Sequence, residues 1–218
     1  MTILPARLLR LFAFVLISLT TLLPPTLMAQ TASPRSLPEQ TTTTPATISS
    51  ATNADSAWQA AEVEKIDRII LLCLVRLRVA PDVAKAKWNS QSPVTDAARE
   101  AVVVQDFTSK AAALQIDAGL AQGFILGQIE ASKMVQSSLM AHWQKVGQAK
   151  FDPAPDLAKD VRPILDALTP QMLAALQALV PLRARAGFAQ VLARERKKWA
   201  RNEPSPLALD AALASLLP

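Results

Sequence analysis

The sequence predicts an all-α protein, built as a multi-helix bundle of about six helices. Residues that favour helices, chiefly Ala, Leu, Gln, Lys and Arg, dominate its 218 positions, whereas it contains 5 Gly and no Tyr. Apolar residues recur three and four positions apart over long segments, which is the period that lines one face of a helix. Few stretches alternate as a strand would, so helices are the expected elements.

Residues 1–29 have the features of a secretory signal peptide. Arg7 and Arg10 precede a short apolar run, and small residues then offer cleavage after Ala29 or, alternatively, after Ala32. The run is short for a membrane span, so a signal anchor is the less favoured interpretation. We therefore expect an exported protein, periplasmic or secreted, with no stable membrane anchor after the signal is cleaved.

The next segment, residues 30–55, is rich in Thr, Ser and Pro and poor in large apolar side chains. It buries too little surface to offset the entropy lost on ordering, so it is predicted to be a disordered linker. A helical domain over residues 56–218 follows, long enough for a sizeable core. Its single cysteine, Cys73, lies in an apolar run, so packing must hold the domain together without an internal disulfide. From residue 57 onward, 20 Lys and Arg against 16 Asp and Glu leave a net charge of +4, which favours small anions but is too small to indicate nucleic acid binding.

The first helix is predicted over residues 56–79, with Asp55 or Ser56 available as its cap. Its apolar residues at helical spacing are Trp58, Val63, Ile66, Ile70, Cys73, Leu74 and Leu77. Ala80 and Pro81 are expected to end this helix and to leave a connection before the next one.

The second and third helices have clear start signals. Ser92 followed by Pro93 places a capping hydroxyl before a proline at the first helical position, where the missing N–H costs nothing. This second helix is expected to run to about Gln115. Its apolar stripe comprises Val94, Ala98, Ala101, Val102, Phe107 and Leu114. Asp117 is the expected cap of a long third helix over residues 118–146.

The remaining elements are also helical. The stretch FDPAPD is predicted to be a loop, and a helix begins near Asp160 with Pro163 in its first turn; if this helix begins earlier, Pro163 kinks it. Pro170 suggests a second kink or a restart, after which the helical pattern continues. Two shorter helices are predicted to follow, over residues 184–201 and 205–217.

Charged residues interrupt the apolar pattern at two places. Arg76 lies on the apolar side of the first helix, where a buried guanidinium needs an anionic partner, unless it lies at the edge of the stripe and extends into water. Asp96, Arg99 and Glu100 share the opening turns of the second helix, and Lys87 lies in the connection before it. Taken alone, these four describe an ordinary solvated helix start with an ion pair three residues apart.

A polar pair, Ser132 and Gln136, lies on the third helix four residues apart. A satisfied hydrogen-bond pair in the core is the simpler interpretation of this pair. Lys133 points about a quarter turn away from Ser132 and is assigned to the surface.

The whole set of residues nevertheless resembles the active site of the all-helical AroQ class of chorismate mutases. Arg76, Lys87, the run Asp96-Ala97-Ala98-Arg99-Glu100, Ser132 and Gln136 have its order and spacing. The segments VAKAKWNSQSPVTDAARE and QIEASKMVQ, followed by HW, are similar to the secreted, gamma-type subclass. In that subclass a later helix of the same chain supplies a further arginine, and the stretch DVRPILD puts Arg162 at that position.

This resemblance implies an isomerase that converts chorismate to prephenate by an intramolecular Claisen rearrangement, a step of aromatic amino acid biosynthesis, without a cofactor or a metal ion. It implies that arginines bind the two substrate carboxylates, that two donors reach the breaking ether oxygen, and that polar groups bind the ring substituents. The arginines are Arg76, Arg99 and Arg162, the ether donors Lys87 and Gln136, and the ring ligands Ser132, Asp96 and Glu100. A homodimer with a complete site in each chain is also implied.

Two other functions remain open at the level of the sequence. The same fold could serve as a periplasmic helical anion-binding module without turnover. The basic run ARERKKWAR, residues 193–201, could contact an anionic membrane or partner, although a solvated helix face is the simpler interpretation.

Overall fold

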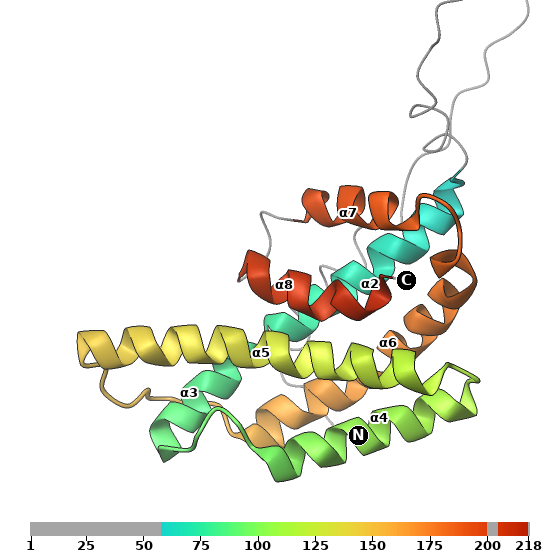
Figure 1. Cartoon of the computed structure of the whole chain (residues 1–218). Coiled ribbons are helices and arrows are strands. Elements are labelled where there is room, and N and C mark those ends of the chain that lie inside the picture. The colour runs from blue at the N-terminus through green and yellow to red at the C-terminus, as the bar shows by residue number, and fades with distance from the viewer. Residues whose placement is uncertain (1–57, 200–204, 218) are drawn as a thin grey trace, which may run out of the picture. The chain divides into compact units, whose positions relative to one another are not determined.

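The structure, a computed structural model, describes residues 58–199 and 205–217, and the regular elements within these ranges are all helical (Figure 1). The all-α prediction is therefore confirmed. The elements are α2 (Ala60–Leu77), α3 (Ala80–Ser90), α4 (Ala97–Ala113), α5 (Ala118–Val146), a π-helical turn η3 (Leu157–Val161), α6 (Arg162–Arg183), α7 (Phe188–Lys198), α8 (Pro206–Leu213) and η5 (Ala214–Leu216). The predicted signal peptide, residues 1–29, and the linker, residues 30–55, lie outside the described residues.

Helix α2 supplies much of the core and contacts α5, α6, α7 and α8. Its start is closed by a capping box, in which the backbone N–H of Gln59 donates to the Glu62 carboxylate at 3.0 Å. The buried residues of α2 are Ile66, Ile69, Ile70, Leu72, Cys73, Leu74, Val75 and Leu77. Burying a side chain of this kind contributes about 1.5–3 kcal/mol, so this helix is firmly fixed in the bundle.

The connection predicted after α2 is wrong, because these residues form the helix α3. Pro81 lies in the first turn of α3, where its missing N–H leaves no intrahelical bond unmade, so this proline starts a helix instead of ending one. The helix ends at Gln91, which adopts the left-handed conformation with φ 55°. Lys87 is consequently held on a helix and not in a loop.

The predicted start of the second helix is also wrong. Helix α4 begins at Ala97, and its N-cap is Asp96, whose Oδ1 accepts from the backbone N–H of Arg99 at 3.1 Å. Ser92 precedes the helix, with its Oγ 2.9 Å from Oγ of Ser90. Aspartate caps a helix at least as well as serine, and Glu100 strengthens the choice by accepting from the backbone N–H of Asp96 at 3.2 Å.

The apolar stripe predicted for this helix is only partly buried. Phe107 is in the core, whereas Ala98, Ala101 and Val102 are exposed. Val102 and Phe107 both line a cavity for which α4 forms one wall, whereas Ala98 and Ala101 do not line it.

Helix α5 is the longest element, at 29 residues, and crosses the whole bundle (Figure 1). Asp117 caps it as predicted, with Oδ1 accepting from the backbone N–H of Leu120 at 2.8 Å. It ends at Gly147, whose φ of 65° suits a residue without a Cβ. Because α5 contacts α2, α3, α4 and α8, it fixes the spacing of these helices.

The segment FDPAPD is non-helical, as predicted, and leads into the turn η3, which continues directly into α6. Asp156 caps η3 by accepting from the backbone N–H groups of Ala158 and Lys159 at 2.7 and 3.0 Å. The helical segment thus begins before the predicted start near Asp160. Pro163 lies in the first turn of α6, and Pro170 lies within α6 without ending it.

Helix α8 packs along α5 and closes the described part of the bundle. The amide of Gln128 donates to the carbonyl oxygen of Ala212 at 2.8 Å. Arg183, at the end of α6, donates to the carbonyl oxygens of Leu216 and Leu217, both at 2.9 Å. The packing of α8 is close, because a Cβ placed on Gly127 would lie 2.8 Å from the carbonyl oxygen of Ala211.

Substituting Gly127 by Ala should therefore destabilise the protein. The added Cβ forces α8 to shift, and such overpacking costs about 1–3 kcal/mol, more than the gain in helix propensity. Urea denaturation followed by tryptophan fluorescence measures the change. The matched control is Gly123→Ala, where the added Cβ would lie 3.3 Å from the side chain of Ser215 and a smaller loss is expected. Equal stability of the two variants would contradict this account of α8.

Candidate active site

A cavity of about 510 Å³ lies between α2, α3, α4, α5 and the η3–α6 segment. This volume is typical of small-molecule sites, which are roughly 300–1,000 Å³. All eight residues singled out in the sequence line it, namely Arg76, Lys87, Asp96, Arg99, Glu100, Ser132, Gln136 and Arg162. The fold thus brings together side chains from five elements that are far apart in the sequence.

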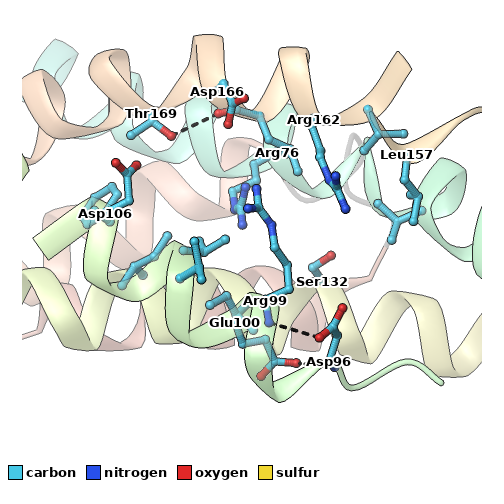
Figure 2. Close-up of a pocket in the computed structure, with 18 of the residues that line it drawn as sticks. Arg76, Asp96, Arg99, Glu100, Asp106, Ser132, Leu157, Arg162, Asp166 and Thr169 are labelled. Carbon is cyan, nitrogen blue, oxygen red and sulfur yellow. Dashed lines mark hydrogen bonds between the residues drawn. The ribbon is translucent and has the colours of Figure 1, made fainter. Parts of the chain in front are cut away.

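Arg76 reaches the cavity from the last turn of α2, where the surrounding helix is apolar (Figure 2). Its Nε is buried without a hydrogen-bond partner. Burial lowers the pKa of the guanidinium to about 10, with the nearby Cys73 acting in the opposite direction. A buried donor without a partner is costly, so this side chain is suited to an anion that enters the cavity.

Lys87 lies on α3, half-buried, and donates from Nζ to the backbone carbonyl of Val94 at 2.5 Å. Burial lowers its pKa, while Asp96 and Glu100 oppose the shift. The ammonium group is therefore held at the cavity wall by the segment that connects α3 to α4. It retains further N–H donors for a ligand.

The start of α4 carries three of the candidate residues. The carboxylate of Asp96 is occupied by the backbone N–H of Arg99, and the carboxylate of Glu100 by the backbone N–H of Asp96. The side chain of Arg99 extends from this turn toward the middle of the cavity, as Figure 2 shows. Capping thus fixes where the helix begins and, with it, the backbone position from which the Arg99 side chain extends.

Ser132 and Gln136 line the cavity from α5, and Nε2 of Gln136 donates to Oγ of Ser132 at 2.9 Å. Gln136 is buried, 4% exposed, and its Oε1 has no hydrogen-bond partner. One amide N–H of Gln136 is therefore used within the protein, and the second remains for a ligand.

Arg162 is the first residue of α6 and points into the cavity from the side opposite Arg99 (Figure 2). Asp166 and Thr169 follow it on the same wall, and neither was predicted from the sequence as a site residue. Their spacing of four and seven residues from Arg162 was the available signal, because it puts all three on one helix face.

Lys133 was assigned to the surface, and this assignment is wrong. It lines the cavity, and its Nζ lies 3.5 Å from the Glu100 carboxylate and 3.1 Å from that of Glu130. The hydrogen bond with Glu130 is the main cause of its raised pKa. The cavity wall is wider than one residue row of α5, so a side chain a quarter turn from Ser132 still reaches it.

The cavity has an excess of positive charge. Its cations are Arg76, Lys87, Arg99, Lys110, Lys133 and Arg162, and its carboxylates are Asp96, Glu100, Asp106 and Asp166. Lys110 pairs with Asp106 at 2.7 Å, and Lys133 pairs with glutamates, so the surplus lies on the three arginines and Lys87. In the described residues, no group of three or more His, Cys, Asp or Glu side chains could hold a metal ion. The arrangement suits a small dianion held by several forked donors.

Comparison with known proteins bears on this site. Residues 60–137 match the family model described as chorismate mutase type II. The crystal structure of chorismate mutase from Burkholderia thailandensis is similar at 35% identity and a TM-score of 0.66, over 70% of this chain and 98% of that one. The crystal structure of chorismate mutase from Burkholderia phymatum is similar at 31% identity and a TM-score of 0.68, over 73% of this chain and 99% of that one. The secreted chorismate mutase from Yersinia pestis shares the fold at 17% identity and a TM-score of 0.52, over 68% of this chain and 94% of that one. No curated protein sequence matches this chain.

The unpartnered Nε of Arg76 should reduce the stability of the empty protein. We expect Arg76→Met to raise the free energy of unfolding by about 1–3 kcal/mol, because a buried, unsatisfied donor is replaced by an apolar side chain of similar length. Urea denaturation without ligand measures this change. The matched control, also on α2, is Arg68→Met, which removes a guanidinium that donates to Gln171 at 3.0 Å and should not stabilise the protein. A loss of stability in Arg76→Met would contradict the view that the protein leaves the charge of Arg76 uncompensated.

Proposed function

The chain belongs to the type II chorismate mutase family, and from this premise we propose that the cavity lined by Arg76, Arg99 and Arg162 is where chorismate becomes prephenate. The activity is an isomerisation, so atoms are neither gained nor lost. One carbon–oxygen ether bond breaks while a carbon–carbon bond forms in the same molecule. The observation that supports the site best is the convergence of three arginines and Lys87 on one cavity, since the substrate is a flexible dianion.

Catalysis then has two requirements, and neither involves a nucleophile. The first is to hold the side chain of chorismate folded over the ring, so that the two carbon atoms that will bond are close. The second is to stabilise the negative charge that develops on the ether oxygen in the transition state. A rigid set of donors meets both requirements, because it need not reorganise as the bonds change.

The carboxylates are assigned to the arginines. Arg76, Arg99 and Arg162 approach from α2, α4 and α6, and a guanidinium can bind a carboxylate through two parallel N–H donors (Figure 2). Ser132 is assigned to the ring carboxylate, with its hydroxyl already oriented by Gln136 at 2.9 Å. Ligands on both carboxylates from different helices restrict rotation about the ether linkage.

The ether oxygen is assigned two donors, Lys87 and Gln136. Lys87 is held by the carbonyl of Val94, and the carboxylates of Asp96 and Glu100 favour its charged form against the effect of burial. Gln136 has one amide N–H free after bonding to Ser132. The ring hydroxyl is assigned to Glu100 and to the backbone near Asp96, at the start of α4.

Export and assembly are part of the proposal. The basic and apolar pattern of residues 1–29 supports a signal peptide and hence a periplasmic or secreted enzyme. Within the described residues, the segment Leu157–Arg183 could cross a membrane by length and composition, but Leu168, Leu176 and Leu179 are buried in the bundle, which supports a core helix. We expect a homodimer in which each chain holds a complete site.

Removing Arg99 should abolish most of the activity. Arg99→Ala is expected to lower kcat/KM roughly a hundredfold or more, a loss on the order of 3 kcal/mol of transition-state stabilisation. The decrease in chorismate absorbance measures the rate. The control is Lys85→Ala on α3, whose ammonium pairs with Asp82 at 3.2 Å outside the cavity and should leave the rate unchanged.

The same assay separates an enzyme from a binding module. If the unmodified protein binds chorismate without consuming it, the fold serves as an anion-binding module. If it turns chorismate over and Arg99→Ala retains a near-normal rate, the reaction stands but Arg99 does not belong to its site.

The identity of residue 136 should set the pH dependence. An amide donates a hydrogen bond at any pH, whereas a carboxyl group donates only when protonated. Gln136→Glu should therefore be active at low pH and lose activity as the pH rises through the pKa of the new carboxyl, reaching roughly a hundredfold loss at neutral pH. The pH profile of kcat/KM measures this effect. Gln144→Glu, on the exposed side of α5, is the charge-matched control, and an unchanged profile in Gln136→Glu would remove Gln136 from the ether oxygen.

A further inference from the structure

We propose that Asn89 is a positioning residue that sets the approach of Arg162 to the substrate. Asn89 does not line the cavity. It lies two residues after Lys87 on α3, which turns its side chain about 200° away from that of Lys87. Lys87 therefore faces the cavity while Asn89 faces the connection between α5 and α6. The proposal depends on the substrate role assigned to Arg162 above.

The contact between Asn89 and this connection is a double hydrogen bond. Nδ2 of Asn89 donates to the carbonyl oxygen of Phe151 at 2.8 Å, and Oδ1 accepts from the backbone N–H of Phe151 at 2.9 Å. One side chain thus satisfies both backbone polar groups of a residue 62 positions away in an irregular segment. Such a pair of bonds fixes direction as well as distance, because donor and acceptor must both be aligned.

Aromatic contacts join the same two segments. Trp88, the neighbour of Asn89, meets Trp143 edge to face with ring centroids 5.7 Å apart. Trp143 in turn meets Phe151 at 4.7 Å. These contacts supply apolar burial between side chains, whereas the amide of Asn89 bonds directly to the Phe151 backbone.

The connection leads from this anchor to the cavity, which Leu157 lines six residues after Phe151 and Arg162 eleven residues after it. Asp156 begins the turn η3, and η3 contacts α3 and places Leu157 and Val161 on the cavity wall. Arg162 follows at once as the first residue of α6. A shift of the Phe151 backbone would be transmitted through this short path, so Asn89 fixes the wall that carries Arg162 relative to the wall that carries Lys87.

A double-mutant cycle tests the coupling. Asn89→Asp is nearly isosteric, keeps the acceptor for the Phe151 N–H, and replaces the donor by an oxygen that repels the Phe151 carbonyl. It is expected to raise KM for chorismate about tenfold with a smaller fall in kcat, because Arg162 contributes to carboxylate binding. In an Arg162→Ala background the same change should alter KM less than about twofold, since the residue that Asn89 positions is already gone.

Two further variants make the cycle decisive. Asn89→Ser removes the Asn89 amide without adding charge and should give the same pattern, with native folding verified by circular dichroism. Ser90→Ala is the control on α3, because its hydroxyl bonds to the carbonyls of Ala86 and Lys87 and not to the connection, and KM should not change.

The outcomes distinguish this proposal from the assignment of Arg162. If Arg162→Ala raises KM but the two changes multiply in the double variant, Asn89 acts independently and the positioning role is overturned. An unchanged KM in both Asn89 variants overturns it as well. If Arg162→Ala alone leaves KM unchanged, the substrate role of Arg162 is itself wrong, and the positioning role falls with it while the isomerase activity stands.

Discussion

The site depends on a half-buried cation, Arg76, whose buried Nε has no partner in the protein. Arg76 projects from an apolar helix into a cavity where its Nε has no protein partner, and burial lowers its pKa to about 10. A cation in such a place is tolerated only because the helix carrying it is secured by its other residues, from Ile66 to Leu77. Under the proposed role of Arg76 in substrate binding, stability and ligand affinity therefore oppose each other at this position, and the dense packing of α2 offsets the unfavourable position of Arg76.

The other cations that line the cavity differ in whether a carboxylate pairs with them. Lys110 and Lys133 are paired with carboxylates, which leaves the unneutralised charge on the side chains that point inward. Each of these side chains comes from a different helix, so the positive charges surround the cavity from several directions. Asp96 meets Arg99 through the backbone, because its Oδ1 accepts from the backbone N–H of Arg99.

The sequence predicted which residues meet in this site better than it predicted where the helices that carry them begin and end. Arg76 and Gln136 stand out as polar residues at apolar positions of long helices, but the resemblance of the whole set of residues to the AroQ chorismate mutases, and not helical spacing alone, predicted that they belong to one site. Helix α3 was missed because Pro81 is compatible with both the end of one helix and the start of the next. The start of α4 was misplaced because two good caps, Ser92 and Asp96, compete within a few residues, and tertiary packing decides between them. Lys133 was missed because helical spacing gives its direction but not the width of the cavity.

One row of α5 shows why an unpartnered polar atom does not mark a ligand site by itself. Gln128, Ser132 and Gln136 are spaced four apart, and both glutamines have a buried Oε1 without a partner. The amide of Gln128, however, donates to the carbonyl of Ala212 and to Sγ of Cys73 at 2.8 and 3.3 Å, so it joins α5 to α8 and α2. Gln136 lines the cavity instead and bonds only to Ser132 within the described residues. The same type of side chain is thus a structural link at Gln128 and part of the cavity wall at Gln136, two turns further along α5, and the difference is set by whether α8 or the cavity lies opposite.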